Sequence, residues 1–115
     1  MGLDTYALNS TATDSLPDQL FTHIEPCLIG GMFSGNGGGA SFRGKCYSEY
    51  VESVTGVSLY QEEIPTDTVK MMADKLESAS KETPQYGDPT FQEKKALAQW
   101  FRVVANENGT VGGWW

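Results

Sequence analysis

The chain has 115 residues, 39% of them hydrophobic and 20% charged, and its formal net charge is −7. These values predict a single domain over residues 1–115 with a packed core, and they exclude a largely disordered chain. The acidic balance also argues against binding along a nucleic-acid backbone, which requires a basic face.

The first half of the chain alternates short apolar segments with turns. Residues 1–7 have the alternation of a short strand, and residues 15–24 predict a helix capped by Ser15. Residues 27–33 form an apolar run that is typical of a buried strand. The pair Asn36-Gly37 is a strong hairpin signal, so Phe42 is expected in a returning strand.

The second half is dominated by helical periodicity. A helix is predicted from Lys45 to a stop at Gly56, and a short strand over residues 57–60 follows. A second helix is expected over residues 66–80. Thr90 and Glu93 form a capping box that starts a third helix, which should stop near residues 106–109, and residues 110–115 predict a last strand. This order favours an α+β fold, with three or four helices packed on a small, mostly antiparallel sheet.

The predicted core collects the apolar face of each segment. Its expected members are Leu3, Leu20, Ile29, Phe33, Tyr50, Val54, Met72, Leu76, Leu97, Phe101 and Val104. In the third helix, Phe91 and Trp100 belong to the same apolar set.

Nothing at the N-terminus has the basic start and apolar stretch of a secretory signal, and no apolar run is long enough to cross a bilayer. We therefore expect a cytoplasmic protein without membrane contact, in which Cys27 and Cys46 are buried thiols that form no disulfide. With His23 they are the only soft metal ligands, at a spacing that fits no closed zinc site. A Cys–His nucleophile pair is the alternative. We assign no catalytic residue, metal or cofactor, and the sequence favours a protein that is not an enzyme.

A glycine cluster is the candidate binding site. Glycine permits positive φ and lets a ligand reach backbone N–H groups, which can form a nest for an anion. Two cations follow the cluster, and they are the first in the chain; Arg can grip a phosphate or carboxylate with two hydrogen bonds, and Lys adds a point charge. The predicted site is therefore Gly35, Gly37, Gly38, Gly39, Arg43 and Lys45. The alternatives are a hairpin turn without a ligand and an ion pair of Arg43 with an acid such as Glu49 or Glu52.

Two nucleotide-binding patterns come close to a match at the same place. Gly35-x-Gly37-x-x-Ala40 resembles a dinucleotide fingerprint, but the residues that follow do not open a helix. The segment from Gly39 to Cys46 resembles a Walker A loop, but it ends in a thiol where Mg²⁺ requires a hydroxyl. Neither pattern is complete, so a nucleotide hydrolase is not predicted.

Two adjacent tryptophans, Trp114 and Trp115, close the chain. They either pack into the sheet or belong to an interface, where Trp is enriched. Two functions remain open. One is a binding module for a small anionic or nucleotide-like molecule at the glycine-rich loop. The other is an acidic protein–protein interaction protein, or a homo-oligomer such as a homodimer, that uses the C-terminal tryptophans.

Four stretches also carry a resemblance. The opening M-G-L-D-T-Y-A, the central G-G-M-F-S-G-N-G-G-G-A-S-F-R-G-K-C-Y, the V-T-G-V-S-L-Y and the closing G-G-W-W resemble a group of small bacterial and phage proteins. The resemblance implies a microbial or viral setting and a compact fold. It brings no ligand, activity or catalytic residue to this sequence.

Overall fold

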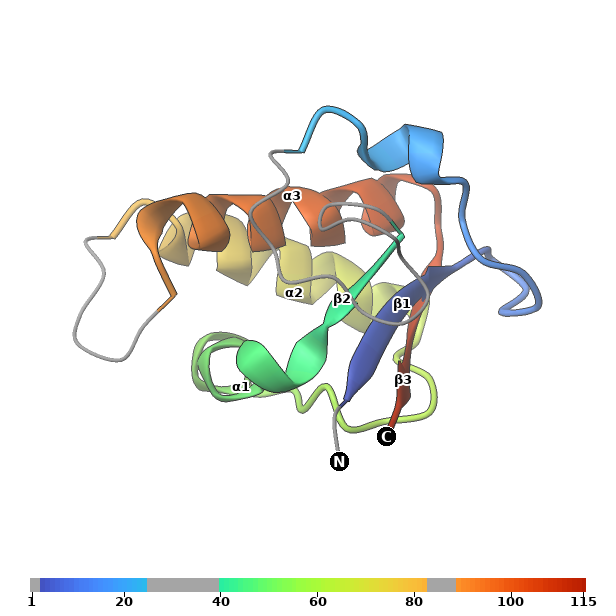
Figure 1. Cartoon of the computed structure of the whole chain (residues 1–115), viewed down its shortest axis with the longest axis horizontal. Helices are drawn as coiled ribbons and strands as arrows, with labels where there is room; N and C mark the ends of the chain where they lie inside the picture. Colours follow the sequence, from blue (N-terminus) through green and yellow to red (C-terminus); the bar gives the residue numbers. More distant parts are fainter. Residues whose placement is uncertain (1–2, 25–39, 83–88) are drawn as a thin grey trace.

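The computed structural model describes residues 3–24, 40–82 and 89–115. A three-stranded antiparallel sheet carries three helices packed on it, so the predicted α+β class is confirmed (Figure 1). The strands are β1 (Asp4–Leu8), β2 (Ser41–Arg43) and β3 (Thr110–Trp114). The helices are α1 (Ser48–Thr55), α2 (Thr66–Ala79) and α3 (Phe91–Asn106), with short 3₁₀ turns η1 (Asp18–Phe21) and η2 (Gly44–Cys46).

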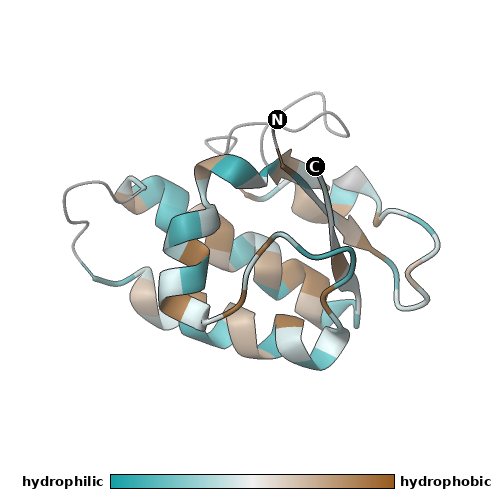
Figure 2. Cartoon of the chain, turned by 90° about the horizontal axis from the view of Figure 1, so that it is seen from below, coloured by the Kyte–Doolittle hydropathy of each residue, from teal (hydrophilic) through white to brown (hydrophobic). Residues whose placement is uncertain are grey.

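The sheet order is β2-β1-β3, so the first strand of the chain is central and the last strand lies beside it. Asp4 stands opposite Arg43 on one side and opposite Trp114 on the other. Seen from below, the C-terminus lies close to the start of β1 (Figure 2). The two ends of the described chain therefore meet at one end of the sheet.

Local signals explain where the helices begin and end. The Thr90 hydroxyl accepts the Glu93 N–H at 3.1 Å, and the Glu93 carboxylate accepts the Thr90 N–H at 3.0 Å, which confirms the capping box at the start of α3. Gly56 caps α1 with φ of 76°, a left-handed conformation that glycine adopts without steric cost. The second helix is also confirmed as α2, although it ends one residue earlier than expected.

The core lies between the sheet and the helices. Trp100 of α3 is fully buried, with its ring centroid 4.8 Å from Phe42 of β2, 5.1 Å from Phe101 and 5.7 Å from Phe21 of η1. The helices carry both hydrophobic and hydrophilic positions, as expected for amphipathic helices that pack one side on a core (Figure 2). The predicted core is confirmed for seven residues: Leu3, Tyr50, Met72, Leu76, Leu97, Phe101 and Val104. Leu20 and Val54 are only partly buried, and Ile29 and Phe33 lie outside the described residues.

Two predicted elements are wrong. The segment 15–24 is not an α-helix, because Ser15 forms a bridge with Leu8 of β1 and leaves only the four residues of η1 in helical form. Residues 57–60 do not form a strand, since the Thr55 and Ser58 hydroxyls accept the N–H groups of Val57 and Tyr60, each at 3.1 Å, and hold the segment in turns.

Two side-chain positions also differ from expectation. Phe91 is 50% exposed. At 100° per residue it points about 120° away from Leu97, off the buried stripe of α3. Cys46 is a free thiol at the surface and not a buried one, while Cys27 lies outside the described residues. Among the described helices, none combines the length and the apolar composition that crossing a bilayer requires.

Candidate functional site

The predicted anion site is only partly described. Gly35, Gly37, Gly38 and Gly39 lie outside the described residues. Arg43 ends β2, and its Nε lies 3.7 Å from Oδ1 of Asp4, which is an ion-pair distance that exceeds a hydrogen bond. The acid beside Arg43 is therefore Asp4, opposite it on β1, and not Glu49 or Glu52. Anion binding at the glycine cluster stays a prediction, because its four glycines lie outside the described residues.

The residues singled out from distant parts of the sequence meet at one end of the sheet. Antiparallel pairing places Arg43, Asp4 and Trp114 in one row across all three strands. The backbone N–H of Lys45 donates to the Leu3 carbonyl at 3.3 Å, which holds Lys45 at the same end. This end lies where β2 and β3 finish and β1 begins (Figure 1).

Three large aromatic side chains are exposed there. Trp114 is 54% exposed, Trp115 51% and Tyr60 41%. The rings of Tyr60 and Trp115 meet edge to face, with centroids 5.6 Å apart. We call Tyr60, Trp114 and Trp115 the aromatic end of the sheet.

The glycine before the tryptophans explains how Tyr60 arrives there. A Cβ atom at Gly113 would lie 2.6 Å from the Leu59 carbonyl oxygen and 2.8 Å from that of Gln61. Only glycine lets these backbone carbonyls approach β3 so closely. The approach of the 59–61 segment brings Tyr60 against Trp115.

Gly112 has a related role on the other face of β3. A Cβ atom there would lie 2.7 Å from two ring carbons of Tyr6, which stands opposite it on β1. The closing G-G-W-W therefore combines two close contacts with two exposed indoles. The sequence hypothesis included the tryptophans but missed Tyr60; the paired glycines inside a predicted strand were the available sign of a close backbone approach.

The two sides of the sheet end carry opposite charge. Arg43 and Lys45 lie on the β2 side. On the β3 side, Ile64 exchanges backbone hydrogen bonds of 2.6 and 3.2 Å with Val111, so the segment that precedes Ile64 runs beside this strand. That segment carries the exposed acids Glu62 and Glu63. The aromatic end thus lies between a cationic side and an anionic side.

The described residues do not form a candidate metal site. Within residues 3–24, 40–82 and 89–115, no group of three or more His, Cys, Asp or Glu side chains is placed to hold a metal ion. At the aromatic end, exposed rings lie at the end of β3 with charged residues on either side.

Comparison with known proteins does not assign the chain to a family. No protein-family model matches the chain, and neither a curated protein sequence nor a solved structure gives a significant match.

Proposed function

We propose that the protein is a homo-oligomeric interaction protein that pairs with a second copy of itself through the aromatic end. The observation that supports this most strongly is the adjacent pair of half-exposed indoles at Trp114 and Trp115, with Tyr60 against the second. Trp and Tyr are the residues most enriched at the energetic centres of interfaces. Leaving this apolar area in water costs free energy that a contact would recover.

Charge placement supports a second copy as the partner. In a two-fold dimer the same patch meets itself, and each side of the patch faces the opposite side of its mate when the axis runs between the two sides. Here such a rotation brings the cationic side, where Lys45 is exposed and Arg43 lies beside Asp4, against the anionic side, with Glu62 and Glu63. The surface is therefore complementary to itself, and such charges fix the register of a contact more than they add to its affinity.

The aromatic end is large enough to be the centre of such an interface, although it is too small to be the whole of it. At about half exposure, and at about 150–250 Å² for each complete side chain, the three rings offer about 300 Å² per protomer. A stable interface buries about 800 Å² on each partner. The flanking charged residues supply the polar rim that completes this area.

Light scattering coupled to size-exclusion chromatography tests the proposal. The wild type is expected at twice its monomer mass of 12.6 kDa, and Trp114→Ala/Trp115→Ala at the monomer mass. Phe91→Ala is the matched control, because Phe91 is as exposed, at 50%, but lies at the start of α3. A wild type that stays monomeric, or a Phe91 variant that dissociates equally, contradicts the proposal.

A further inference from the structure

A second surface lies away from the aromatic end, on α3. A cavity of about 530 Å³ opens between α3, the end of α2 and the residues after η1. Its α3 residues include Phe91, Lys95, Ala98 and Arg102, which follow a spacing of three or four residues, or one turn, and Val103, which lies about 100° around the helix from Arg102. Phe91 and Lys95 are exposed, whereas Ala98 is buried beside the stripe of Leu97, Phe101 and Val104. A volume of this size is typical of small-molecule sites.

Charge in this cavity differs from that of the whole chain. The chain has eight Lys and Arg residues and a net charge of −7, yet three cations, Lys81, Lys95 and Arg102, line this cavity beside one carboxylate, Glu77. A negatively charged ligand is therefore favoured here in spite of the overall acidity.

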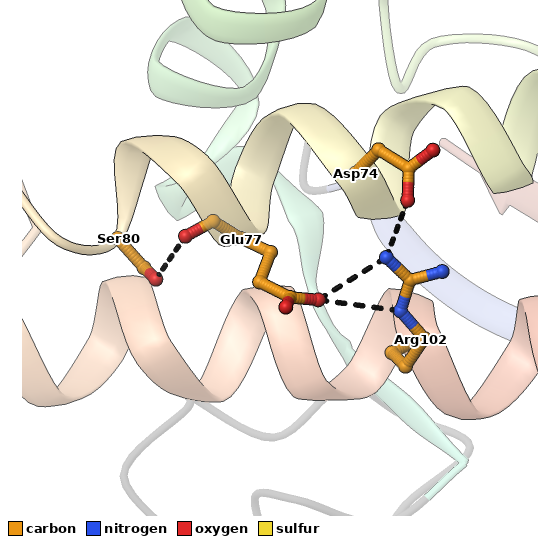
Figure 3. Close-up of polar contacts among 4 residues, drawn as sticks. All are labelled: Asp74, Glu77, Ser80 and Arg102. Carbon is orange, nitrogen blue, oxygen red and sulfur yellow. Dashed lines mark hydrogen bonds and ion pairs between the residues drawn. The ribbon is translucent and has the colours of Figure 1, made fainter.

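Arg102 is already engaged. Its guanidinium donates to Asp74, and to Glu77 at 3.1 and 3.3 Å, so that α3 and α2 are tied together (Figure 3). The hydrogen bond to Asp74 is the main cause that raises the pKa of Arg102; partial burial opposes it, the hydrogen bond to Glu77 adds to it, and Arg102 therefore stays charged. Arg102 therefore links α3 to α2 and already pairs with two carboxylates, Asp74 and Glu77.

Lys81 and Lys95 have no such engagement. Among the described residues neither ammonium group has a carboxylate within ion-pair distance, and both side chains are exposed. They are the two cations that a bound anion can recruit without breaking an existing ion pair.

The same cavity also has an apolar part. Phe91 is 50% exposed, Val103 is partly buried, and Ala98 lines the cavity although it is only 4% exposed. An anion without an apolar body, such as inorganic phosphate, would leave this part in water. A ligand with both a charged head and a hydrocarbon body covers both parts.

We propose that the cavity on α3 binds a small amphipathic carboxylate, whose head lies between Lys81 and Lys95 and whose apolar body lies along α3 against Ala98 and Val103. This site is independent of the proposed self-association, because it shares no residue with the aromatic end.

Titration of the full-length protein with sodium octanoate, followed by heteronuclear NMR, tests the inference. Binding in the millimolar range is expected, with the largest amide shifts around Ala98 and Val103. Lys81→Gln/Lys95→Gln should weaken binding about tenfold, because the carboxylate loses both ammonium groups. The matched control is Lys70→Gln/Lys75→Gln, which removes the same charge from α2 at positions outside this cavity, and it should leave the affinity unchanged.

Two further ligands separate the contribution of the carboxylate from that of the hydrocarbon chain. Octan-1-ol, which has the chain without the charge, and inorganic phosphate, which has charge without the chain, should each bind at least about tenfold more weakly than octanoate. Trp114→Ala/Trp115→Ala should bind octanoate like the wild type. The inference would be overturned if the two lysine double variants lost the same octanoate affinity, or if octan-1-ol bound as tightly as octanoate. It would also be overturned if millimolar octanoate caused no amide shift.

Discussion

Removing one hydroxyl group, in Tyr47→Phe, tests how the helices are tied together. Tyr47 is 2% exposed, and its hydroxyl donates to Oε2 of Glu93 at 2.6 Å. The other oxygen of this carboxylate accepts the Thr90 N–H that belongs to the capping box of α3. The substitution keeps the ring in the core and removes the bond that joins Tyr47, the residue between η2 and α1, to the start of α3.

The expected cost follows from the charge on the acceptor. A hydrogen bond to a charged group is worth about 1.5–3 kcal/mol, and Glu93 keeps both water and the Thr90 N–H, so we expect about 1.5 kcal/mol. For a chain of this size that corresponds to about 6 °C in melting temperature.

The pH dependence gives the sharper assay. Burial opposes ionisation of Glu93, but the hydrogen bonds from Tyr47 and Thr90 outweigh it and lower the pKa of this carboxyl in the folded state. A lowered folded pKa contributes stability above the unfolded pKa, about 4.3 for Glu, and that stability is lost as the pH falls through the folded value. The cost of Tyr47→Phe should therefore be largest at neutral pH and shrink in acid.

Urea unfolding from neutral pH down to about pH 3 measures this difference, because it gives the free energy of unfolding at each pH. In a Glu93→Gln background, which carries no ionisable group at position 93, the cost of Tyr47→Phe should be small and independent of pH. A cost that does not change with pH in the wild-type background would refute the reasoning.

Three further predictions follow from single contacts. Gly113→Ala should destabilise the protein by about 2 kcal/mol or more, because the new Cβ would meet two backbone carbonyl oxygens. Gly56→Ala should cost about 1 kcal/mol, because Gly56 has a positive φ but open space around it, and calorimetry compares the two variants. Arg102→Ala should change the free energy of unfolding by about 1 kcal/mol or less, since its ion pairs are exposed to solvent. Lys45→Glu and Glu62→Lys should each weaken self-association, and mixing the two variants should restore it in a heterodimer, which native mass spectrometry detects.

Local patterns were enough to find the helices. Thr90 and Glu93 predicted the start of α3, Gly56 predicted the end of α1, and the spacing of Leu97, Trp100 and Phe101 predicted the buried face. These signals depend on residues within a turn or two of one another, so they can be read without knowing the fold.

Long-range pairing decided what the sequence could not. Ser15 looked like a helix cap, but it pairs with Leu8 once the chain has turned back on β1. The row of Arg43, Asp4 and Trp114 joins the middle and both ends of the chain, and no local pattern encodes that register. The candidate site was therefore recognised only in part, as separate cations and tryptophans whose proximity the sheet creates.

Sedimentation equilibrium measures the dissociation constant of the dimer and so tests whether the aromatic end joins two copies. A concentration-dependent dimer is expected for the wild type. For Trp114→Ala/Trp115→Ala we expect Kd to rise by at least about 100-fold, which is about 2.8 kcal/mol, because paired aromatic residues at an interface centre contribute at least that much. Phe91→Ala should match the wild type. A wild type that sediments as a 12.6 kDa monomer at every concentration, or a tryptophan variant with an unchanged Kd, would contradict the account.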